Sequence, residues 1–453
     1  MRVLIISPHF PPCNAADMHR VRLVLPYLKE QGIQAEVLAV ESEQVATPMD
    51  PWLALGLPEE VPVHRVKARS LSWAKIPGLG LLEARALSAL RKQGNALLQS
   101  GHFDLVYFST TVFGLHVLGP EWQRKFGVPF VMDYQDPWVS DYYREHPEVR
   151  PPGGRLKYAV ANWLSRRREP NVLRHCRGIT SVSPAYPDQL AKRYPWLKIL
   201  ASNSAAVTNE VTKVGLNHAL PALVVPFPGD SRDFDRVRQG GVSQSVFDPA
   251  DGFKHWVYVG RGGADMRFAM RAFFSALRQL REAGEEDFLQ RLRMHFIGTS
   301  YAAAGHAQKT IEPVAAEFGL ESVVCEHTDR IPYSETLRCL LDADALIIPG
   351  SDDPAYTASK MYPYLLAGRP LLAVFHEASS VVKLIQKAGG GSIVAFHPEE
   401  SLAAVSQRLV DILGRASGEI PHIVLDPLAF EPHTARLQAS ELAHFWKQCL
   451  IQD

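Results

Sequence analysis

Short apolar runs alternate with helical patterns of apolar residues along most of the chain. In the first half, Val21, Val24, Leu25 and Leu28 recur at helical spacing between two runs that have the character of buried strands. Gly32 follows where this helix is expected to end, which completes one βαβ unit. The predicted strands of the first half are Val3–Ser7, Ala35–Val40, Asp104–Phe108, Pro129–Met132, Gly178–Val182 and Leu223–Val225.

The second half repeats this alternation. Its predicted strands are His255–Val259, Met294–Ile297, Val323–Glu326, Ala345–Ile348, Leu371–Val374 and Ser392–Ala395. Its predicted helices are Phe268–Arg281, Ile311–Phe318, Glu335–Leu341, Lys360–Leu366 and Val381–Lys387. Because strands and helices alternate in both halves, each half is predicted to be a doubly wound α/β domain with a parallel sheet.

A segment with little periodicity, 226–252, separates the two halves and is rich in Gly, Pro, Asp and Ser, as expected of a linker. We therefore predict Rossmann-like domains over residues 1–225 and 253–424. Residues 425–453 are predicted to cross back and to end in a helix whose apolar stripe packs on the N-terminal domain. Two such domains would face a central cleft, since open sheets bind ligands at the carboxyl ends of their strands.

Composition excludes several classes of protein. The 453 residues are 46% hydrophobic and 21% charged, and 48 basic residues balance 48 acidic ones, so global charge gives no reason to expect a nucleic-acid partner. The five cysteines are scattered and show no metal-ligand spacing. No window approaches the roughly 20 apolar residues of a membrane span. We therefore expect a cytoplasmic protein with reduced thiols.

One candidate site lies in the segment 349–370, where a predicted strand ends, a polar loop follows and a helix begins near Ser359. Lys360 stands in the first turn of that helix, where a cation is unfavourable unless an anion lies in front of it. A capped helix with an outward-turned lysine is the alternative. The candidate ligand-binding residues of this segment are Asp352, Asp353, Tyr356, Thr357, Ser359 and Lys360.

A second candidate site follows another predicted strand, at Gly260, Arg261 and Gly262. Glycines let a backbone approach a phosphate, and Arg261 and Arg267 can supply charge-assisted hydrogen bonds. We predict that the two segments share one diphosphate. A nicotinamide dehydrogenase is disfavoured because the glycines do not form a GxGxxG fingerprint.

These motifs resemble those of the retaining GT-B glycosyltransferases of family 4. The resemblance covers almost the whole chain and is most specific at Lys360–Pro370, which is similar to the family pattern SK-x-x-E-Y-L-x-x-G-R-P. The other matching segments are the opening strand with Pro11-Pro12, the first helix ending at Gly32, Asp133–Trp138 and Val259–Arg261. The resemblance implies a GT-B fold, with a donor diphosphate bound by Arg261 and Arg267 and a nucleobase near Arg330 and Ile331. Asp136 joins Arg261 and Lys360 as a catalytic candidate.

The chain also departs from the family pattern. Two glutamates that normally contact the donor sugar and the ribose align with Ala355 and Pro363, so Asp352 and Asp353 are the nearest candidates for those contacts. In the N-terminal domain, the usual paired glycines are replaced by 14–17, and a common histidine aligns with Gln135.

The resemblance implies transfer of a sugar from a nucleotide-diphosphate sugar to a hydroxyl acceptor with retention, in the synthesis of a cell-surface polysaccharide or glycolipid. The acceptor would be a sugar, a lipid-linked sugar or another hydroxyl compound. No cofactor and no metal is expected, because fixed cations would stabilise the leaving diphosphate. A non-catalytic nucleotide-sugar-binding or scaffold protein and a sugar-nucleotide epimerase are the alternatives.

The segment 155–177 is unusually basic, with seven Lys or Arg residues and a single acid, Glu169. Two interpretations stay open. The segment is either a solvated helix face or a surface that docks on an anionic membrane, which would place the protein peripherally at the inner face of the membrane.

Overall fold

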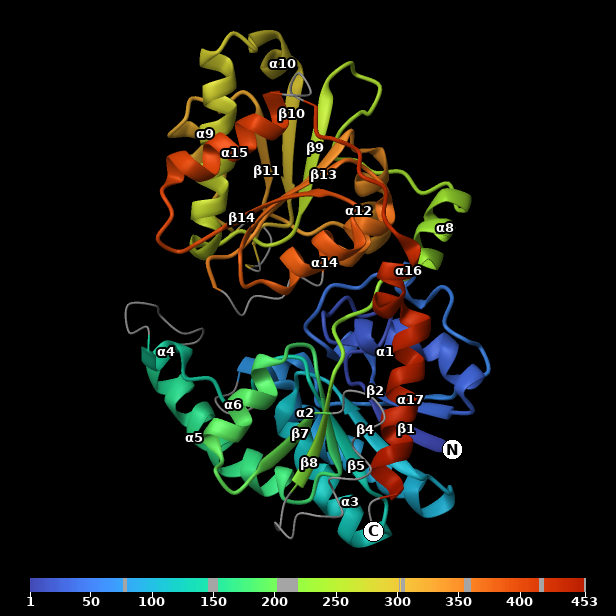
Figure 1. Ribbon diagram of the computed structural model, residues 1–453. Coiled ribbons are helices and arrows are strands. Elements are labelled where there is room, and N and C mark those ends of the chain that lie inside the picture. The colour runs from blue at the N-terminus through green and yellow to red at the C-terminus, as the bar shows by residue number, and fades with distance from the viewer. Residues whose placement is uncertain are drawn as a thin grey trace. The chain divides into compact units, whose positions relative to one another are not determined.

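The computed structural model describes residues 1–75, 80–145, 154–201, 219–300, 302, 306–353, 360–414 and 419–451. The chain divides into two compact units (Figure 1). Unit 1 comprises Met1–Pro228 together with Ala435–Asp453, and unit 2 comprises Gly229–Thr434. Each of the twelve predicted strands overlaps a strand of the structure.

Unit 1 contains an eight-stranded sheet in the order β3-β2-β1-β4-β5-β6-β8-β7, in which all paired neighbours are parallel. Its strands are β1 (Arg2–Ile6), β2 (Gln34–Val40), β3 (Val63–Val66), β4 (Leu105–Ser109), β5 (Phe130–Tyr134), β6 (Gly178–Ser181), β7 (Lys198–Ala201) and β8 (Ala219–Val224). Its helices in the described residues are α1 (Met18–Leu28), α2 (Leu82–Ser100), α3 (Leu118–Phe126), α4 (Tyr142–Glu145), α5 (Arg155–Leu173), α6 (Ala185–Arg193) and α17 (Ala435–Ile451), with 3₁₀ helices η1 (Lys29–Gln31), η2 (Ser42–Gln44), η3 (Pro51–Ala54), η4 (Leu71–Lys75) and η5 (Phe113–Val117).

Strand β1 shows how the sheet separates two apolar layers. Val3 and Ile5 enter a cluster that contains residues of α1 and α17, whereas Leu4 and Ile6 enter a cluster on the other face with residues of α2 and α3. Helix α17 lies beside α1 (Figure 1), and the apolar stripe of the final helix is buried there, including Trp446. The chain therefore completes the core of unit 1 with its last helix.

Strands β3 and β7 were not predicted from the sequence. They form the two edges of the sheet, and each has only four residues. In β3, His64 and Arg65 stand between two valines, and Lys198 opens β7. Edge strands are half solvated and often carry charges, so they lack the apolar runs of the central strands.

Unit 2 contains a six-stranded parallel sheet in the order β11-β10-β9-β12-β13-β14, which is the doubly wound arrangement. Its strands are β9 (Lys254–Val259), β10 (Leu292–Ile297), β11 (Val324–His327), β12 (Ala345–Pro349), β13 (Leu371–His376) and β14 (Ser392–Phe396). Its helices in the described residues are α8 (Ser231–Gln239), α9 (Arg267–Glu282), α10 (Glu286–Arg291), α11 (Glu312–Ala316), α12 (Tyr333–Asp342), α13 (Met361–Ala367), α14 (Ser380–Ala388), α15 (Leu402–Gly414) and α16 (Pro427–Phe430), with η6 (Ala264–Met266) and η7 (Glu431–His433).

Helices α9, α11 and α15 form one group of contacts, and Figure 1 shows α9 and α15 side by side.

Helix α8 packs with α12 and α13 in a second group. The segment predicted as a linker, 226–252, therefore is not an irregular connection throughout, because it contains α8. The side chain of Asp230 caps this helix by accepting a hydrogen bond from the Arg232 N–H at 3.1 Å. Phe234 and Val237 supply its buried face, too few apolar residues to be recognised as a helical stripe.

No helix in the described ranges is both long enough and apolar enough to span a bilayer.

Candidate functional site

The strand order of unit 2 reverses between β9 and β12, so the chain leaves the carboxyl ends of these two neighbours in opposite directions. Such a switch point is where open parallel sheets bind ligands. Both segments singled out in the sequence lie here, since Gly260 follows β9 and Gly350 follows β12. The loops are tied together because the Asp352 N–H donates to the Asp265 carbonyl oxygen at 2.9 Å.

Tyr258 links the two predicted cations. The Lys360 ammonium donates to the Tyr258 hydroxyl at 2.6 Å and lies 4.6 Å from the centre of its ring, while that hydroxyl donates to the Arg261 carbonyl oxygen at 2.8 Å. The Arg261 guanidinium in turn forms two hydrogen bonds with the Asp265 carboxylate, at 2.8 and 2.7 Å. We call Tyr258, Arg261, Asp265 and Lys360 the Lys360 cluster.

The Lys360 cluster is electrostatically unbalanced. Burial and, to a smaller extent, the nearby Arg261 charge lower the pKa of Lys360 to about 7, whereas Asp265 acts in the opposite direction. Hydrogen bonds from Arg261 and Ser351 lower the pKa of Asp265 despite its burial. Asp265 thus acts on both cations, and an anion bound beside them would further favour the charged form of Lys360.

Helix α13 holds Lys360 in place although the lysine does not cap the helix with its side chain. One turn later, the Tyr364 hydroxyl accepts a hydrogen bond from the Val259 N–H at 2.5 Å and donates to the Val259 carbonyl oxygen at 3.1 Å. This reciprocal contact fixes the start of α13 against the end of β9. The helix begins at Met361, with Lys360 at the N-cap position rather than in the first turn.

Gly260 and Gly262 serve packing in this structure. A Cβ atom on Gly260 would lie 2.1 Å from the Lys360 Nζ, and one on Gly262 would lie 2.4 Å from the Thr310 Oγ1. The N–H groups of the two glycines donate to the Ile297 and Thr299 carbonyl oxygens, at 2.9 and 2.8 Å. The absence of a side chain at Gly260 therefore leaves the space that the Lys360 ammonium occupies.

Other predicted residues are placed differently. Arg267 is exposed and donates to Glu317 at 2.5 Å, so the structure does not bring its guanidinium into the Lys360 cluster. Arg330 packs against Gly298, where a Cβ atom would lie 3.7 Å from the Arg330 Cγ, in the loop after β11 that also contains Ile331.

Asp352 and Asp353 are both exposed. Desolvation and the neighbouring Asp265 charge raise the pKa of Asp352. The Asp353 N–H donates to the Ser351 Oγ at 3.1 Å. Tyr356, Thr357 and Ser359 lie outside the described residues, as does Ala355.

Unit 1 has its own switch point, between β1 and β4. There Asp17 is buried and accepts hydrogen bonds from His9 Nδ1 at 2.9 Å, Thr110 Oγ1 at 3.0 Å and the Thr111 N–H at 3.1 Å. These donors lower the pKa of Asp17 although burial opposes them. The loop after β1 is therefore fastened to the loop after β4 through one carboxylate.

Asp136, the predicted catalytic residue of unit 1, follows β5 in the same region. The Asp136 side chain reaches solvent, but the surrounding protein removes part of the water around its carboxyl group. This partial desolvation, together with the Asp17 charge, raises the pKa of Asp136 to about 6. Gln135 holds the loop by donating to the Asp133 carboxylate at 2.8 Å and to the Asp17 carbonyl oxygen at 3.2 Å. A carboxyl group that titrates near neutrality suits proton exchange with a hydroxyl.

Sequence reasoning missed Tyr258, Asp265, Tyr364 and the pair of His9 and Asp17. Asp265 stands four residues after Arg261 in a turn that leads into a helix, and this spacing could have predicted the ion pair between them. The tyrosines gave no signal, because each lies in an apolar run that reads as core.

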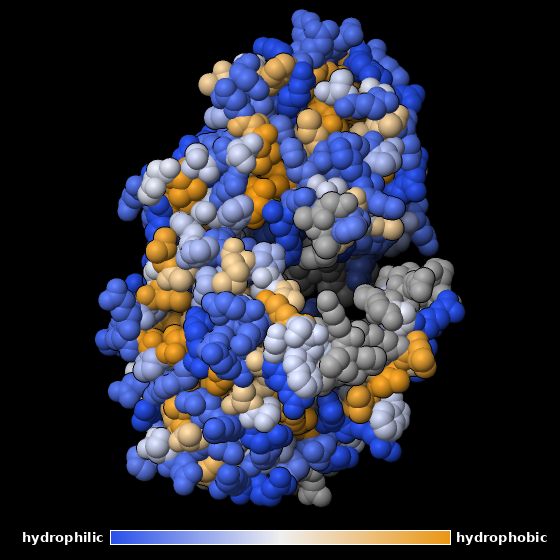
Figure 2. Space-filling model, turned by 180° about the vertical axis from the view of Figure 1, so that it is seen from behind, coloured by the Kyte–Doolittle hydropathy of each residue, from blue (hydrophilic) through white to orange (hydrophobic). Residues whose placement is uncertain are grey.

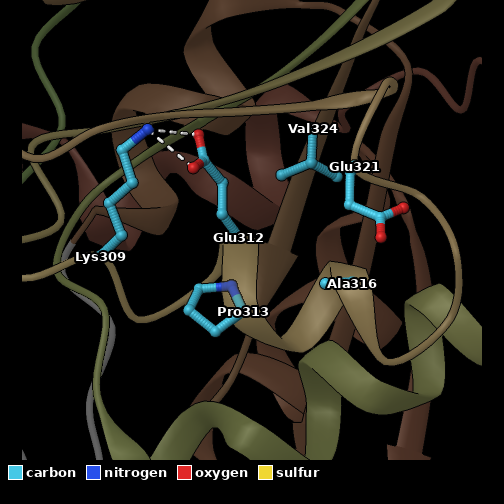
Figure 3. A pocket seen from close by; sticks show the side chains of 6 residues that line it. All are labelled: Lys309, Glu312, Pro313, Ala316, Glu321 and Val324. Atoms are coloured by element: carbon cyan, nitrogen blue, oxygen red, sulfur yellow. Dashed lines mark hydrogen bonds and ion pairs between the residues drawn. The ribbon is translucent and has the colours of Figure 1, made fainter.

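A separate hollow of about 380 Å³ lies at α11 and is lined by Lys309, Glu312, Pro313, Ala316, Glu321 and Val324 (Figure 3). The Lys309 ammonium bonds both carboxylate oxygens of Glu312, at 2.6 and 2.7 Å. No residue of the loops after β9 and β12 lines this hollow, so it is distinct from the Lys360 cluster.

Comparison with known proteins gives the class of fold. No family model and no curated protein matches the sequence. Among solved structures, Anabaena Alr3699/HepE in complex with UDP and glucose is 14% identical, with 99% of each chain covered and a TM-score of 0.56. A glycosyltransferase from Rickettsia africae is 12% identical, with 99% of this chain and 98% of that chain covered and a TM-score of 0.54. An α,α-trehalose-phosphate synthase (UDP-forming) from Burkholderia xenovorans is 12% identical, with 99% and 100% covered and a TM-score of 0.58.

These matches and the two doubly wound sheets show that the chain has the GT-B fold, as the resemblance implied. At such identities the likeness concerns the fold alone.

Proposed function

We propose that this protein is a glycosyltransferase that uses a nucleotide-diphosphate sugar, with the donor diphosphate bound at the Lys360 cluster. The observation that carries the proposal is the partly buried Lys360 ammonium beside Arg261 at the switch point of β9 and β12. Proteins of similar fold were solved with UDP and with UDP-glucose, which supports a donor of this class.

The electrostatic argument favours a diphosphate over a neutral ligand. Desolvating a lysine costs free energy unless a partner of opposite charge is present, and Asp265 is already engaged by Arg261. A diphosphate would supply that partner and could be bound by both cations. The same cations would stabilise the negative charge that develops when the diphosphate leaves, so no metal ion is required.

We propose that transfer proceeds with retention of the anomeric configuration. The bond between the anomeric carbon and the diphosphate oxygen breaks, and its electron pair leaves with the phosphate. The acceptor hydroxyl oxygen forms the new bond on the same face, and its proton passes to the departing phosphate oxygen. Asp136 is proposed to bind the acceptor hydroxyl, which its pKa of about 6 allows it to do as acceptor or donor.

Calorimetric titration of the full chain with UDP and other nucleoside diphosphates tests the donor site. Lys360→Met and Arg261→Met should each weaken UDP binding by at least about tenfold, the loss expected for a charged hydrogen bond. Arg278→Met is the matched control, because Arg278 is an exposed arginine of α9 paired with Glu282. Undiminished UDP binding by both site variants would reject the proposed site.

Incubation with nucleotide sugars and a panel of hydroxyl acceptors tests transfer, and the anomeric proton of the product, followed by NMR, reports retention. We propose a cytoplasmic enzyme that builds a cell-surface polysaccharide or glycolipid on a sugar or lipid-linked acceptor, so the panel should include lipid-linked sugars. An inverted product would overturn the retaining mechanism while leaving the donor site intact.

A nucleotide-sugar-binding protein without turnover is the second candidate, and one observation favours it. Pro363 lies in the first turn of α13, where the family resemblance places a ribose-binding glutamate, and proline offers neither carboxylate nor N–H. Tight binding of a nucleotide sugar with no consumption in the presence of any acceptor would support this candidate.

A further inference from the structure

Helix α5 in unit 1 carries an apolar stripe that faces solvent. Leu156, Val160 and Trp163 are 81%, 53% and 53% exposed. Their spacing of four and three residues places them on one face of the helix. Single exposed apolar residues are ordinary, but three adjacent ones on one helix face form a patch that requires a reason.

The stripe is continued by cations. Arg167 lies one turn beyond Trp163 on the same face, and its guanidinium is 4.5 Å from the centre of a Trp163 ring. Arg174 follows at the end of the helix and is also exposed, with its guanidinium 4.7 Å from a ring of Trp196. The exposed face of α5 therefore combines an apolar half with a cationic half.

The single acid of the segment does not neutralise this face. Glu169 is fully buried, and its carboxylate accepts hydrogen bonds from Tyr194 at 2.7 Å, Tyr134 at 3.3 Å and Arg193 at 3.3 Å. Since Glu169 points into the unit, the positive charge at the surface of α5 has no acidic residue of the same helix beside it.

The helix is firmly attached on its other side. Val172 and Leu173 belong to the core, the Tyr158 hydroxyl donates to the Ser140 carbonyl oxygen at 2.6 Å, and Arg166 pairs with Asp141. In Figure 2 the molecule is seen from behind, so the side of α5, at the left in Figure 1, lies at the right. Hydrophobic side chains reach the surface there among hydrophilic ones. The exposed stripe is thus a fixed surface of unit 1.

We propose that α5 docks unit 1 on the surface of an anionic phospholipid bilayer. Leucine, valine and tryptophan would enter the boundary between headgroups and acyl chains, a region that tryptophan favours. Arg167 and Arg174 would lie at the level of the phosphate groups, to which the helix offers positive charge without an acidic neighbour of its own. The contact requires neither a nucleotide sugar nor the Lys360 cluster, so it stands independently of the proposed function.

Flotation of the full chain with phosphatidylcholine vesicles, with and without phosphatidylglycerol, tests the docking. We expect binding to the anionic vesicles only, weakened by raising the salt from about 0.1 to 0.5 M, because salt screens the arginines. Leu156→Ser/Trp163→Ser should lower the partition coefficient at least about tenfold, and Arg167→Glu/Arg174→Glu should lower it more, since each cation near such a surface contributes about fivefold.

The matched control is Val424→Ser/Leu428→Ser, which removes an apolar pair at least as exposed on average (77% and 80%) from unit 2 and should leave vesicle binding unchanged. Urea unfolding followed by circular dichroism reports whether each variant is folded, without recourse to any ligand. Equal recovery with neutral and anionic vesicles, or an equal loss in the control, would overturn the proposal. Concentration-dependent self-association abolished by the α5 variants would assign the stripe to a second copy of the chain and would also overturn it.

Discussion

Lys360 provides the sharpest test of the donor site, because its pKa of about 7 couples nucleotide binding to proton uptake. Near pH 8 the free protein should hold this lysine largely neutral, whereas a diphosphate beside it should restore the charged form. UDP binding must then draw a proton from the buffer. Replacing Lys360 by methionine removes the titrating group while keeping most of the apolar side chain.

The magnitude follows from the pKa. With a pKa of about 7, roughly one lysine in eleven is protonated at pH 8, so binding takes up about 0.9 proton, and the lysine's share of the uptake falls to about 0.5 at pH 7. Because the protonated form binds, the apparent Kd for UDP should rise about fiftyfold between pH 7 and pH 9. The terminal phosphate, whose second ionisation lies near pH 6, is already about nine-tenths in its fully charged form at pH 7, so it changes the Kd little over that range.

Calorimetry in two buffers of different ionisation enthalpy, such as HEPES and Tris, measures the proton uptake directly. We expect Lys360→Met to bind UDP more weakly, with no uptake and with little dependence on pH between 7 and 9. Proton uptake that persists in Lys360→Met, or a Kd in the original protein that does not change between pH 7 and pH 9, would refute the reasoning.

Three further predictions concern single contacts. Gly260→Ala should displace the Lys360 ammonium, which a Cβ atom would approach to 2.1 Å, and UDP titration should show a loss of affinity at least as large as about tenfold. Arg20→Met should lower the free energy of unfolding in urea by about 3–5 kcal/mol, because the guanidinium is buried with Asp133 at 3.1 Å and its loss leaves that buried carboxylate without a counter-charge; Arg20→Met/Asp133→Asn should recover part of the loss. Burial lowers the pKa of His116 to about 4, below its unfolded value of about 6.5, so the stability contributed by the neutral imidazole should be fully present above pH 6.5 and fall by up to about 3 kcal/mol towards pH 4. His116→Phe should remove this contribution, so the fall in the free energy of unfolding between pH 6.5 and pH 4 in urea titrations should be smaller by up to about 3 kcal/mol, and an unchanged slope would contradict the assignment.

The fold could be predicted from the sequence because buried parallel strands are written as apolar runs. The runs that became β1, β4, β9 and β12 are buried over most of their length and consist mostly of apolar residues. The two edge strands and α8 could not be predicted, because each contains few apolar residues. Helix α8 depends instead on its Asp230 cap and on contacts with α12 and α13.

The candidate site was predictable in part. Arg261 and Lys360 could be found because both follow strands whose carboxyl ends neighbour each other only in the doubly wound order. The ion pair of Arg267 with Glu317 could not be predicted from the sequence, because sequence does not reveal which carboxylate lies near a long exposed side chain; its contact with the diphosphate stays a prediction. Tyr258 escaped notice because its ring is core while only its hydroxyl reaches the site.

The lowered pKa of Lys360 means that burying this lysine costs the protein folding free energy. In an empty site, a lysine whose pKa is lowered to about 7 from 10.5 binds fewer protons in the folded than in the unfolded chain, so the free energy of unfolding should rise as pH increases between these values, by up to roughly 1.4 kcal/mol per pH unit. A residue kept only for packing would not impose such a cost, because methionine would fill the same space without a charge. The hydrogen bonds of Tyr258 and Tyr364 hold the lysine and the start of α13 in place despite this cost. Lys360→Met should therefore equal or exceed the original protein in thermal stability at pH 6 while losing UDP affinity, which is the signature of a group placed for a ligand rather than for the fold.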